Sequence, residues 1–253
     1  MLRRVRAYLS KTIFKLNIKL HEKKYKTKKA EVKYLLYRKK KSKDLIIIFS
    51  GMSSQRAVYN YVTTLKNESV NRLYILDDAG ADKLGCYYIG TNNNNEIEIA
   101  VTELIEYIVG KYQLNNLKCV GSSKGGYAAI NFGLAFNADI IVGAPQFYLG
   151  YYLTHPYIKP MLTTILGENY LKEDFEVLET RLYNCIVKYK DQYTKTIYLH
   201  YSIKEHTYQE HIADLIENLK KMEYKMVLDE LKYNKHDEVA IYFPIFLKKI
   251  LNL

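Results

Sequence analysis

The 253-residue chain has no tryptophan, few cysteines and no uninterrupted apolar run near the roughly 18 residues that a membrane-spanning helix needs. Because no such run is present, the sequence predicts no transmembrane segment. The first residues carry the charges of a signal peptide but lack the apolar segment that should follow them. An apolar content of 48% and a mean hydropathy of −0.26 are typical of a globular protein. We therefore expect a cytoplasmic protein, with the inner face of the membrane as a second, peripheral location.

Cysteine and histidine are too sparse and too scattered for common metal or disulfide patterns. Cys86, Cys119 and Cys185 are odd in number and widely spaced, which favours neither a disulfide framework nor a metal site. His206 and His211 lie five positions apart and do not form the H-E-x-x-H pattern of zinc enzymes. The sequence therefore predicts no metal site and no permanently bound cofactor.

Acidic residues are scarce at the beginning of the chain. Residues 1–43 contain 17 Lys or Arg but only two Glu, a net charge of +15, so the rest carries −4 of the total +11. Residues 1–29 are therefore predicted to form a basic N-terminal extension. Such a segment attracts anionic lipid, nucleic acid or a polyanionic glycan. We expect a membrane surface or a glycan rather than nucleic acid, while packing on the body or on a second subunit stays open. Its apolar residues recur at helical spacing: Leu2, Val5, Leu9, Ile13, Leu16 and Leu20.

From residue 30 to residue 253, strand-like apolar runs alternate with helical patterns. This alternation predicts one α/β catalytic domain with a mostly parallel sheet and helices on both faces. Residues 146–191 are irregular and then helical, which predicts a small cap over the site. The expected strands are Val32–Tyr37, Leu45–Ser50, Leu73–Asp77, Leu117–Gly121, Asp139–Ala144, Thr196–Ser202 and Lys225–Leu231. The expected helices outside the cap are Arg56–Lys66, Glu96–Tyr112, Lys124–Phe136, Tyr208–Met222 and Glu238–Ile250.

The most informative stretch is LKCVGSSKGGYAA, residues 117–129. It has the G-x-S-x-G pattern between an apolar run and a helical pattern, which is the nucleophile elbow of the α/β-hydrolase fold. So tight a turn forces Ser123 into a strained conformation, and Gly121 and Gly125 flank it because side chains there would collide. We therefore expect Ser123 to be an exposed nucleophile at a helix N-terminus.

A serine nucleophile needs a base, and the base needs an acid to orient it. In this fold the acid and the histidine follow late strands, in the order Ser, acid, His. Glu205 follows one late strand and His236 follows the last one, so we assign Glu205 as the acid and His236 as the base. Asp229 is an alternative acid, and His206 is a competing base.

The oxyanion hole of such an enzyme uses two backbone N–H groups. We expect one from Lys124, directly after the nucleophile, and one from Met52, where Gly51 lets the backbone approach the substrate closely. Two expectations for the Lys124 side chain stay open, exposure to solvent or attraction of an anionic substrate or donor. Gln146 follows the strand end at Pro145 and is a candidate for a hydrogen bond to substrate.

The segments GSSKGGYAA, GAPQFYLGYYL, HYSIKEHTY and NKHDEVA, with LIIIFSGM and ILDD upstream, form a more specific combination than the elbow alone. Together they resemble the α/β-hydrolase-fold O-acetyltransferases of bacterial capsule polysaccharide synthesis. They are more distantly similar to the glycan-acetylating protein of the accessory Sec system. The resemblance covers Val32 to the C-terminus and leaves the basic extension outside.

This resemblance implies a function as well as a fold. It implies that Ser123 is the nucleophile, His236 the base and Glu205 the acid, although capsule enzymes of this kind often have Asp there. Gln146 matches the glutamine of the A-P-Q stretch of the family. The resemblance also implies acetyl-CoA as the donor and a polysaccharide or oligosaccharide hydroxyl as the acceptor.

Two other functions stay open at this point. With water as the acceptor, the same residues would make a carboxylesterase or deacylase. A protein that kept the fold without catalysis would be an interaction protein of glycan biosynthesis. Transfer to a sugar requires acceptor positioning and exclusion of water, which the aromatic segment Phe147–Tyr157 is suited to provide.

Overall fold

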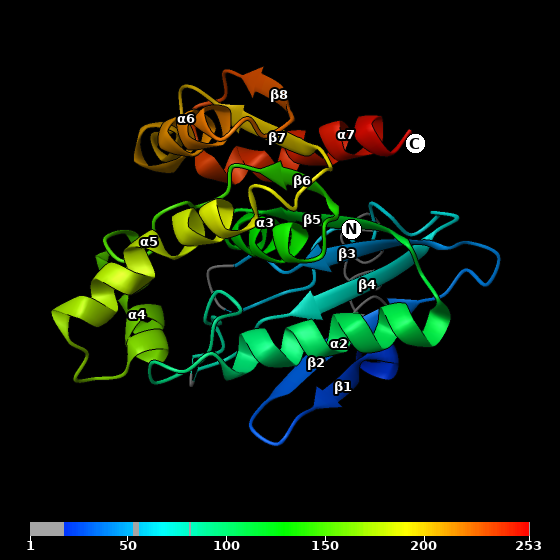
Figure 1. Cartoon of the computed structure of the whole chain (residues 1–253), viewed down its shortest axis with the longest axis horizontal. Helices are drawn as coiled ribbons and strands as arrows, with labels where there is room; N and C mark the ends of the chain where they lie inside the picture. Colours follow the sequence, from blue (N-terminus) through cyan, green and yellow to red (C-terminus); the bar gives the residue numbers. More distant parts are fainter. Residues whose placement is uncertain (1–17, 53–55, 81, 253) are drawn as a thin grey trace, which may run out of the picture.

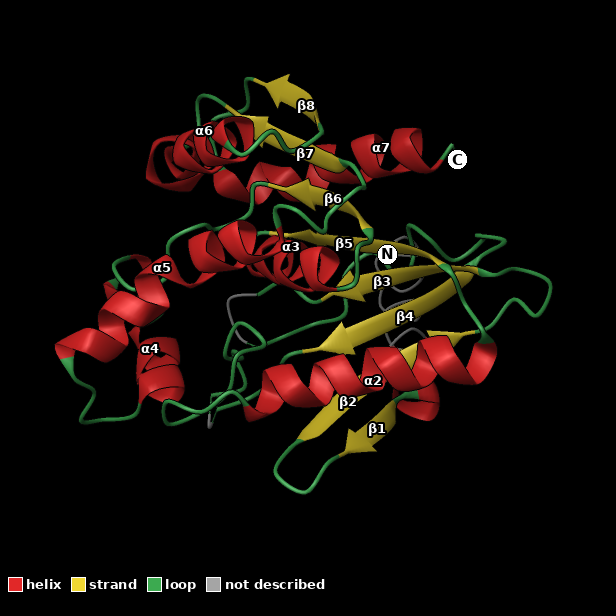
Figure 2. Cartoon of the chain, in the orientation of Figure 1, coloured by secondary structure: helices red, strands yellow, loops and turns green. Residues whose placement is uncertain are grey.

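The computed structural model describes residues 18–52, 56–80 and 82–252, which contain one eight-stranded sheet (Figures 1 and 2). The strand order is β1-β2-β4-β3-β5-β6-β7-β8. The β1–β2 and β2–β4 pairs are antiparallel, and all other neighbours are parallel, as the alternation of strands and helices predicts. The strands are β1 Lys23–Lys26, β2 Glu31–Tyr37, β3 Asp44–Phe49, β4 Asn71–Leu76, β5 Asn116–Ser122, β6 Asp139–Gly143, β7 Ile197–Ser202 and β8 Met226–Leu231.

Helices cover both faces of the sheet. One face packs against α2, α3, α5 and α6, and the other packs against α7 and the chain between β3 and β4. Helix α4 and the first part of α5 lie in the range predicted for the cap and extend beyond one side of the sheet (Figure 1). The helices are α2 Glu96–Tyr112, α3 Lys124–Ala135, α4 Lys159–Leu166, α5 Lys172–Tyr189, α6 Ala213–Lys221 and α7 Val239–Leu251. Short helical turns are η1 Tyr152–Thr154, the π-helical η2 Tyr208–Ile212 and η3 His236–Glu238.

Strand β3 illustrates why the central strands are continuous apolar runs in the sequence. Alternate side chains of a strand point to opposite faces. Leu45 and Ile47 therefore pack in the core under α2 and α3, whereas Ile46 and Ile48 pack in the core under α7. Because both faces are covered, every one of these positions is buried and apolar.

The helix predicted over Arg56–Lys66 is wrong. The chain forms a series of turns there, and Tyr61 has a φ of 60°, which interrupts a right-handed helix. The periodicity that suggested a helix reflects burial, because Val62 and Leu65 both enter the core under α7. The side chain of Asn60 accepts a hydrogen bond from the distant Gly51 N–H at 2.6 Å, which no local pattern predicts.

The sheet begins inside the range that we assigned to the basic extension. Strand β1 pairs antiparallel with β2, and Lys24 and Lys26 contact Glu31 across this pair at 2.7 and 3.2 Å. Lysines suit the edge of a sheet because they discourage pairing with another chain. Most of the predicted amphipathic helix, residues 1–17, lies outside the described residues, and its final turn is helical up to His21. Within the described ranges, none of the helices combines the length and apolar character needed to cross a bilayer.

The parallel strands bring distant parts of the sequence to one edge of the sheet. The carboxyl ends of β3, β5, β6, β7 and β8 lie at this edge, and ligands of open α/β sheets bind there. The segments that directly follow these strands contain all the residues predicted for the site: Gly51, Met52, Ser123, Lys124, Gln146, Glu205 and His236.

Candidate active site

Ser123 lies in a sharp turn between β5 and α3. Its φ of 52° and ψ of −124° place it in a strained region for a side-chain-bearing residue. The turn brings backbone so close that a Cβ on Gly121 would lie 2.0 Å from the Gly125 carbonyl oxygen. A Cβ on Gly125 would lie 2.5 Å from the Phe49 carbonyl oxygen. The Ser123 N–H donates to the Gly143 carbonyl at 2.9 Å, which ties the turn to the neighbouring strand.

Ser123, His236 and Glu205 form a continuous hydrogen-bonded chain. His236 Nε2 lies 2.9 Å from Ser123 Oγ, and His236 Nδ1 lies 3.0 Å from Glu205 Oε2. A carboxylate can only accept, so Nδ1 donates and Nε2 has a lone pair directed at the serine hydroxyl. The Glu205 side chain is fully buried, and its second oxygen accepts the Thr207 hydroxyl, so neither carboxylate oxygen lacks a partner.

The loop that holds His236 is fixed by hydrogen bonds from side chains to its backbone. Glu238 accepts the N–H groups of Asn234 and Lys235 at 3.0 and 2.8 Å. Ser202, at the end of β7, donates its hydroxyl to the Tyr233 carbonyl at 2.5 Å. These contacts join the loop before α7 to the strand that leads to Glu205, so the base and the acid are held relative to one another.

In the structure, the alternative acid Asp229 is not part of the hydrogen-bonded chain at Ser123. Asp229 Oδ2 contacts His200 Nδ1 at 2.7 Å, on adjacent strands β7 and β8. His200 is completely buried, and burial lowers the pKa of its imidazole. The competing base His206 is exposed, with its ring centroid 5.9 Å from that of His236. Neither residue takes the position of Glu205 or His236 beside Ser123.

Gln146 contacts the serine itself. It is fully buried, and its Nε2 donates to Ser123 Oγ at 3.1 Å while its Oε1 lies 3.3 Å from the same atom. Because the hydroxyl has a single proton, the Nε2 contact leaves that proton free to point at His236. Ala144, with a φ of 40°, turns the chain after β6 toward the site.

The loop after β3 is also firmly placed. The Tyr88 hydroxyl lies 2.5 Å from the Ser50 N–H and donates to the Ile75 carbonyl at 2.9 Å. The Gly51 N–H is used by Asn60, so Gly51 does not offer this group to a substrate. Met52 forms an isolated bridge with Ala57. On the other side, Lys124 is the first residue of α3, and its N–H has no partner within the helix.

Both expectations for the Lys124 side chain are wrong. It is completely buried, and its Nζ donates to Asp77 Oδ2 at 3.1 Å, to the Asp77 carbonyl at 3.0 Å and to the Leu84 carbonyl at 2.7 Å. Gly85 has a φ of 98°, and a Cβ there would lie 2.2 Å from Nζ. Sequence reasoning missed Asp77 and Gly85, because their partner is about 40 positions away. The only local signal is a polar pair, Asp77-Asp78, directly after a buried strand.

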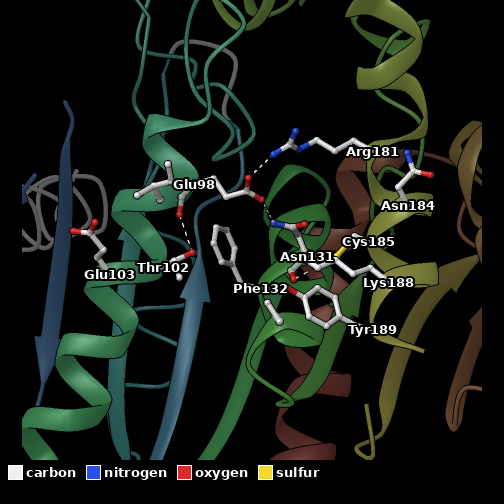
Figure 3. Close-up of a pocket in the computed structure, with 12 residues that line it drawn as sticks. Glu98, Thr102, Glu103, Asn131, Phe132, Arg181, Asn184, Cys185, Lys188 and Tyr189 are labelled. Atoms are coloured by element: carbon white, nitrogen blue, oxygen red, sulfur yellow. Dashed lines mark hydrogen bonds and ion pairs between the residues drawn. The ribbon is translucent and has the colours of Figure 1, made fainter. Parts of the chain in front are cut away.

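A separate cavity of about 440 Å³ lies between α2, α3 and α5 (Figure 3). Three of its polar groups contact one another, because Glu98 accepts the Asn131 amide at 2.8 Å and pairs with Arg181. Burial raises the pKa of the Cys185 thiol to about 12, so this sulfur is a poor nucleophile. In the part of the chain that the structure describes, no group of three His, Cys, Asp or Glu could hold a metal ion.

Replacing Lys124 by Met should strongly destabilise the protein, because the buried Asp77 carboxylate would lose the ammonium group that pairs with it. Breaking one side of a buried pair costs about 3–5 kcal/mol in free energy of unfolding. Lys118→Met is a matched control, since the Lys118–Asp139 pair at 3.0 Å is about a third exposed and should contribute at most about 1 kcal/mol. Urea unfolding of both variants measures the difference, and equal losses would contradict this role for Lys124.

No protein-family model matches the chain, and no curated protein matches it in sequence. Solved structures do resemble it. The capsule O-acetyltransferase of Neisseria meningitidis serogroup A is 20% identical, with a TM-score of 0.75 over 91% of this chain and 94% of that one. A variant of the same enzyme in complex with CoA is 19% identical, with a TM-score of 0.74 over 92% of this chain and 95% of that one.

Two further structures are similar. The Glycosylation Associate Protein complex from Streptococcus agalactiae is 19% identical, with a TM-score of 0.75 over 92% of this chain and 47% of that one. An S-formylglutathione hydrolase from Agrobacterium tumefaciens is 12% identical, with a TM-score of 0.62 over 90% of this chain and 92% of that one. At such identities the likeness shows the fold, and this chain has the α/β-hydrolase fold.

Proposed function

We propose that this protein is a serine-dependent O-acetyltransferase that moves an acetyl group from acetyl-CoA to a sugar hydroxyl of a bacterial surface polysaccharide. The observation that carries the proposal is the hydrogen-bonded chain from Ser123 through His236 to the buried Glu205. The likeness to a capsule O-acetyltransferase and to its variant in complex with CoA supports the choice of donor and acceptor.

In the first half of the proposed reaction, Ser123 takes the acetyl group. His236 Nε2 accepts the hydroxyl proton as Oγ attacks the thioester carbonyl, and the imidazolium is stabilised by the buried Glu205 carboxylate. The N–H groups of Lys124 and Met52 are the proposed donors to the tetrahedral oxyanion. Collapse breaks the C–S bond, and His236 returns its proton to the CoA sulfur, leaving an acetyl ester on Ser123.

In the second half, a sugar hydroxyl reverses these steps. His236 Nε2 removes the proton of the hydroxyl as its oxygen attacks the acetyl carbonyl, and the same N–H groups hold the second oxyanion. Breaking the ester bond returns the proton to Ser123 Oγ and releases an acetylated sugar. The contact from Gln146 Nε2 to Ser123 Oγ, 3.1 Å in the free enzyme, holds this oxygen in line with His236.

A basic cavity supports the proposed donor. It has a volume of about 440 Å³ at the carboxyl end of β4 and includes Ala57, which bridges to Met52 in the proposed oxyanion loop. Four basic residues and two acidic ones line the cavity, and Lys33 pairs with Asp78. The remaining excess of cations suits the phosphates of CoA. Its charged residues are Lys19, Lys33, Arg56, Lys83, Glu22 and Asp78.

The donor also bears on location and partners. Because acetyl-CoA is a cytoplasmic metabolite, the proposal assigns the reaction to the cytoplasm. The basic residues 1–29 stay a candidate for contact with an anionic membrane surface or a polyanionic glycan. The likeness to the S. agalactiae glycosylation complex is consistent with glycan-related partners.

Replacing Glu205 by Gln should reduce kcat by about two to four orders of magnitude, because the amide cannot stabilise the His236 imidazolium or fix its tautomer. The matched change Asp229→Asn removes the carboxylate that contacts His200 and should leave kcat within about threefold of the parent, since Asp229 lies outside the chain to Ser123. Release of free CoA in the presence of an acceptor measures both rates. A larger loss in Asp229→Asn would reassign the acid.

The second candidate function, a carboxylesterase or deacylase, is favoured by the likeness to an S-formylglutathione hydrolase. Incubation with acetyl-CoA, with and without capsule-type oligosaccharides, separates the two. For a transferase we expect faster release of CoA with the right oligosaccharide and an equal amount of acetylated sugar. Equal release in both mixtures with no acetylated sugar would exclude transfer and leave hydrolysis.

A further inference from the structure

We propose that the pocket beside His236, lined by tyrosines and carboxylates, is the acceptor subsite and that its charge selects neutral or amino-bearing sugars over anionic ones. This inference rests on the proposed function, because it concerns the second substrate of the same site. It adds the chemical class of that substrate, which the hydrogen-bonded chain at Ser123 leaves open.

The pocket lies between the segment after β6, α5 and the π-helical turn η2 before α6. Its volume of about 520 Å³ is in the range of about 300–1,000 Å³ that is typical of ligand pockets. The acceptor would need to reach Ser123 from here, and one ring contact and one short stretch of sequence connect the pocket to the catalytic residues. The ring of His206, which lines the pocket, lies 5.9 Å from that of His236. Tyr148, also in the lining, follows Gln146 by two residues.

The aromatic lining suits a sugar. Tyr148, Tyr151 and Tyr152 all line the pocket, and a tyrosine offers an apolar face together with a polar tip. Tyr151 is 72% exposed and packs edge-on against Phe175 with ring centroids 5.0 Å apart. An exposed ring held in one orientation can stack on the apolar face of a pyranose at little entropic cost.

The pocket carries two carboxylates, Glu179 and Glu210, and none of its described lining residues is Lys or Arg. Its formal charge is therefore negative while its histidines are neutral. These are His155, His206 and His211, and His206 Nε2 lies 3.9 Å from Glu210 Oε2. Glu179 Oε2 accepts the Tyr151 N–H at 3.1 Å, so its carboxylate is held beside the ring that would stack. The buried His211 does not offset these charges, because desolvation lowers its pKa to about 4 and keeps it neutral. Carboxylates accept hydroxyl or ammonium protons but repel carboxylates and phosphates.

This charge also distinguishes the two cavities of the site. The pocket at His206 is acidic, whereas the cavity near Met52 has an excess of basic residues. An anionic donor such as CoA is therefore directed to the basic cavity near Met52, and an uncharged or cationic acceptor is directed to the pocket at His206. Opposite charges on the two cavities would keep each substrate out of the place of the other.

Binding to the Ser123→Ala variant of the full chain tests the inference without any turnover. The probes are trimers of N-acetylglucosamine, glucosamine and galacturonic acid, which are neutral, cationic and anionic, and calorimetry measures each Kd. We expect the anionic trimer to bind at least about tenfold more weakly than the neutral one. Adding Glu210→Gln should reduce the ratio of the two Kd values, anionic over neutral, by about fivefold. Glu106 is an exposed carboxylate on α2 outside the pocket, so Glu106→Gln should leave this ratio unchanged.

Two variants of Tyr151 test the contribution of its ring to binding. Tyr151→Ala should weaken binding of the neutral trimer by about tenfold, and Tyr151→Phe should retain it, because the ring face and not the hydroxyl makes the contact. Equal or tighter binding of the anionic trimer, no response to Glu210→Gln, or no binding of any trimer would overturn the inference. Failure of acetyl transfer in the parent protein would instead overturn the proposed function and leave these binding results unchanged.

Discussion

The close approach of α3 to β5 at the elbow is the constraint on which the site depends. A helix can begin directly above the strand end only because Gly121 and Gly125 have no side chains, since a Cβ at either would meet backbone atoms within 2.5 Å. This approach forces Ser123 to a φ of 52° and points its hydroxyl away from the sheet, toward His236. The same turn leaves the first N–H groups of α3 without helical partners, close to the nucleophile.

The buried Lys124–Asp77 pair stabilises this arrangement. Lys124 follows the nucleophile directly, and its ammonium group crosslinks the start of α3 to the loop after β4 through three hydrogen bonds. Asp77 in turn accepts the N–H groups of Cys86 and Tyr88, and the Tyr88 hydroxyl holds Ser50 at the end of β3. A network of buried polar groups therefore connects the two segments proposed to form the oxyanion hole.

Sequence patterns predicted the fold because its central strands are buried on both faces, which makes them continuous apolar runs such as residues 45–49. The same patterns predicted that Ser123, Glu205 and His236 lie close together. Each residue follows a strand, and the carboxyl ends of parallel strands meet at one edge of the sheet. Contacts between distant residues could not be predicted in this way. The burial of Lys124 depends on Asp77, and the irregular chain near Asn60 depends on Gly51; neither partner is near in sequence. The pairing of Asp229 with His200 likewise requires the register of β7 and β8.

In the proposed reaction, Ser123 carries the acetyl group between the two substrates. Mixing the protein with acetyl-CoA in the absence of acceptor, quenching in acid and sequencing the peptides by mass spectrometry tests it directly. We expect one acetyl ester on Ser123, which forms before CoA release reaches its steady rate and disappears when a sugar acceptor is added. Acetylation of the sugar that continues in the Ser123→Ala variant, or that proceeds with no acetyl ester on Ser123, would contradict it.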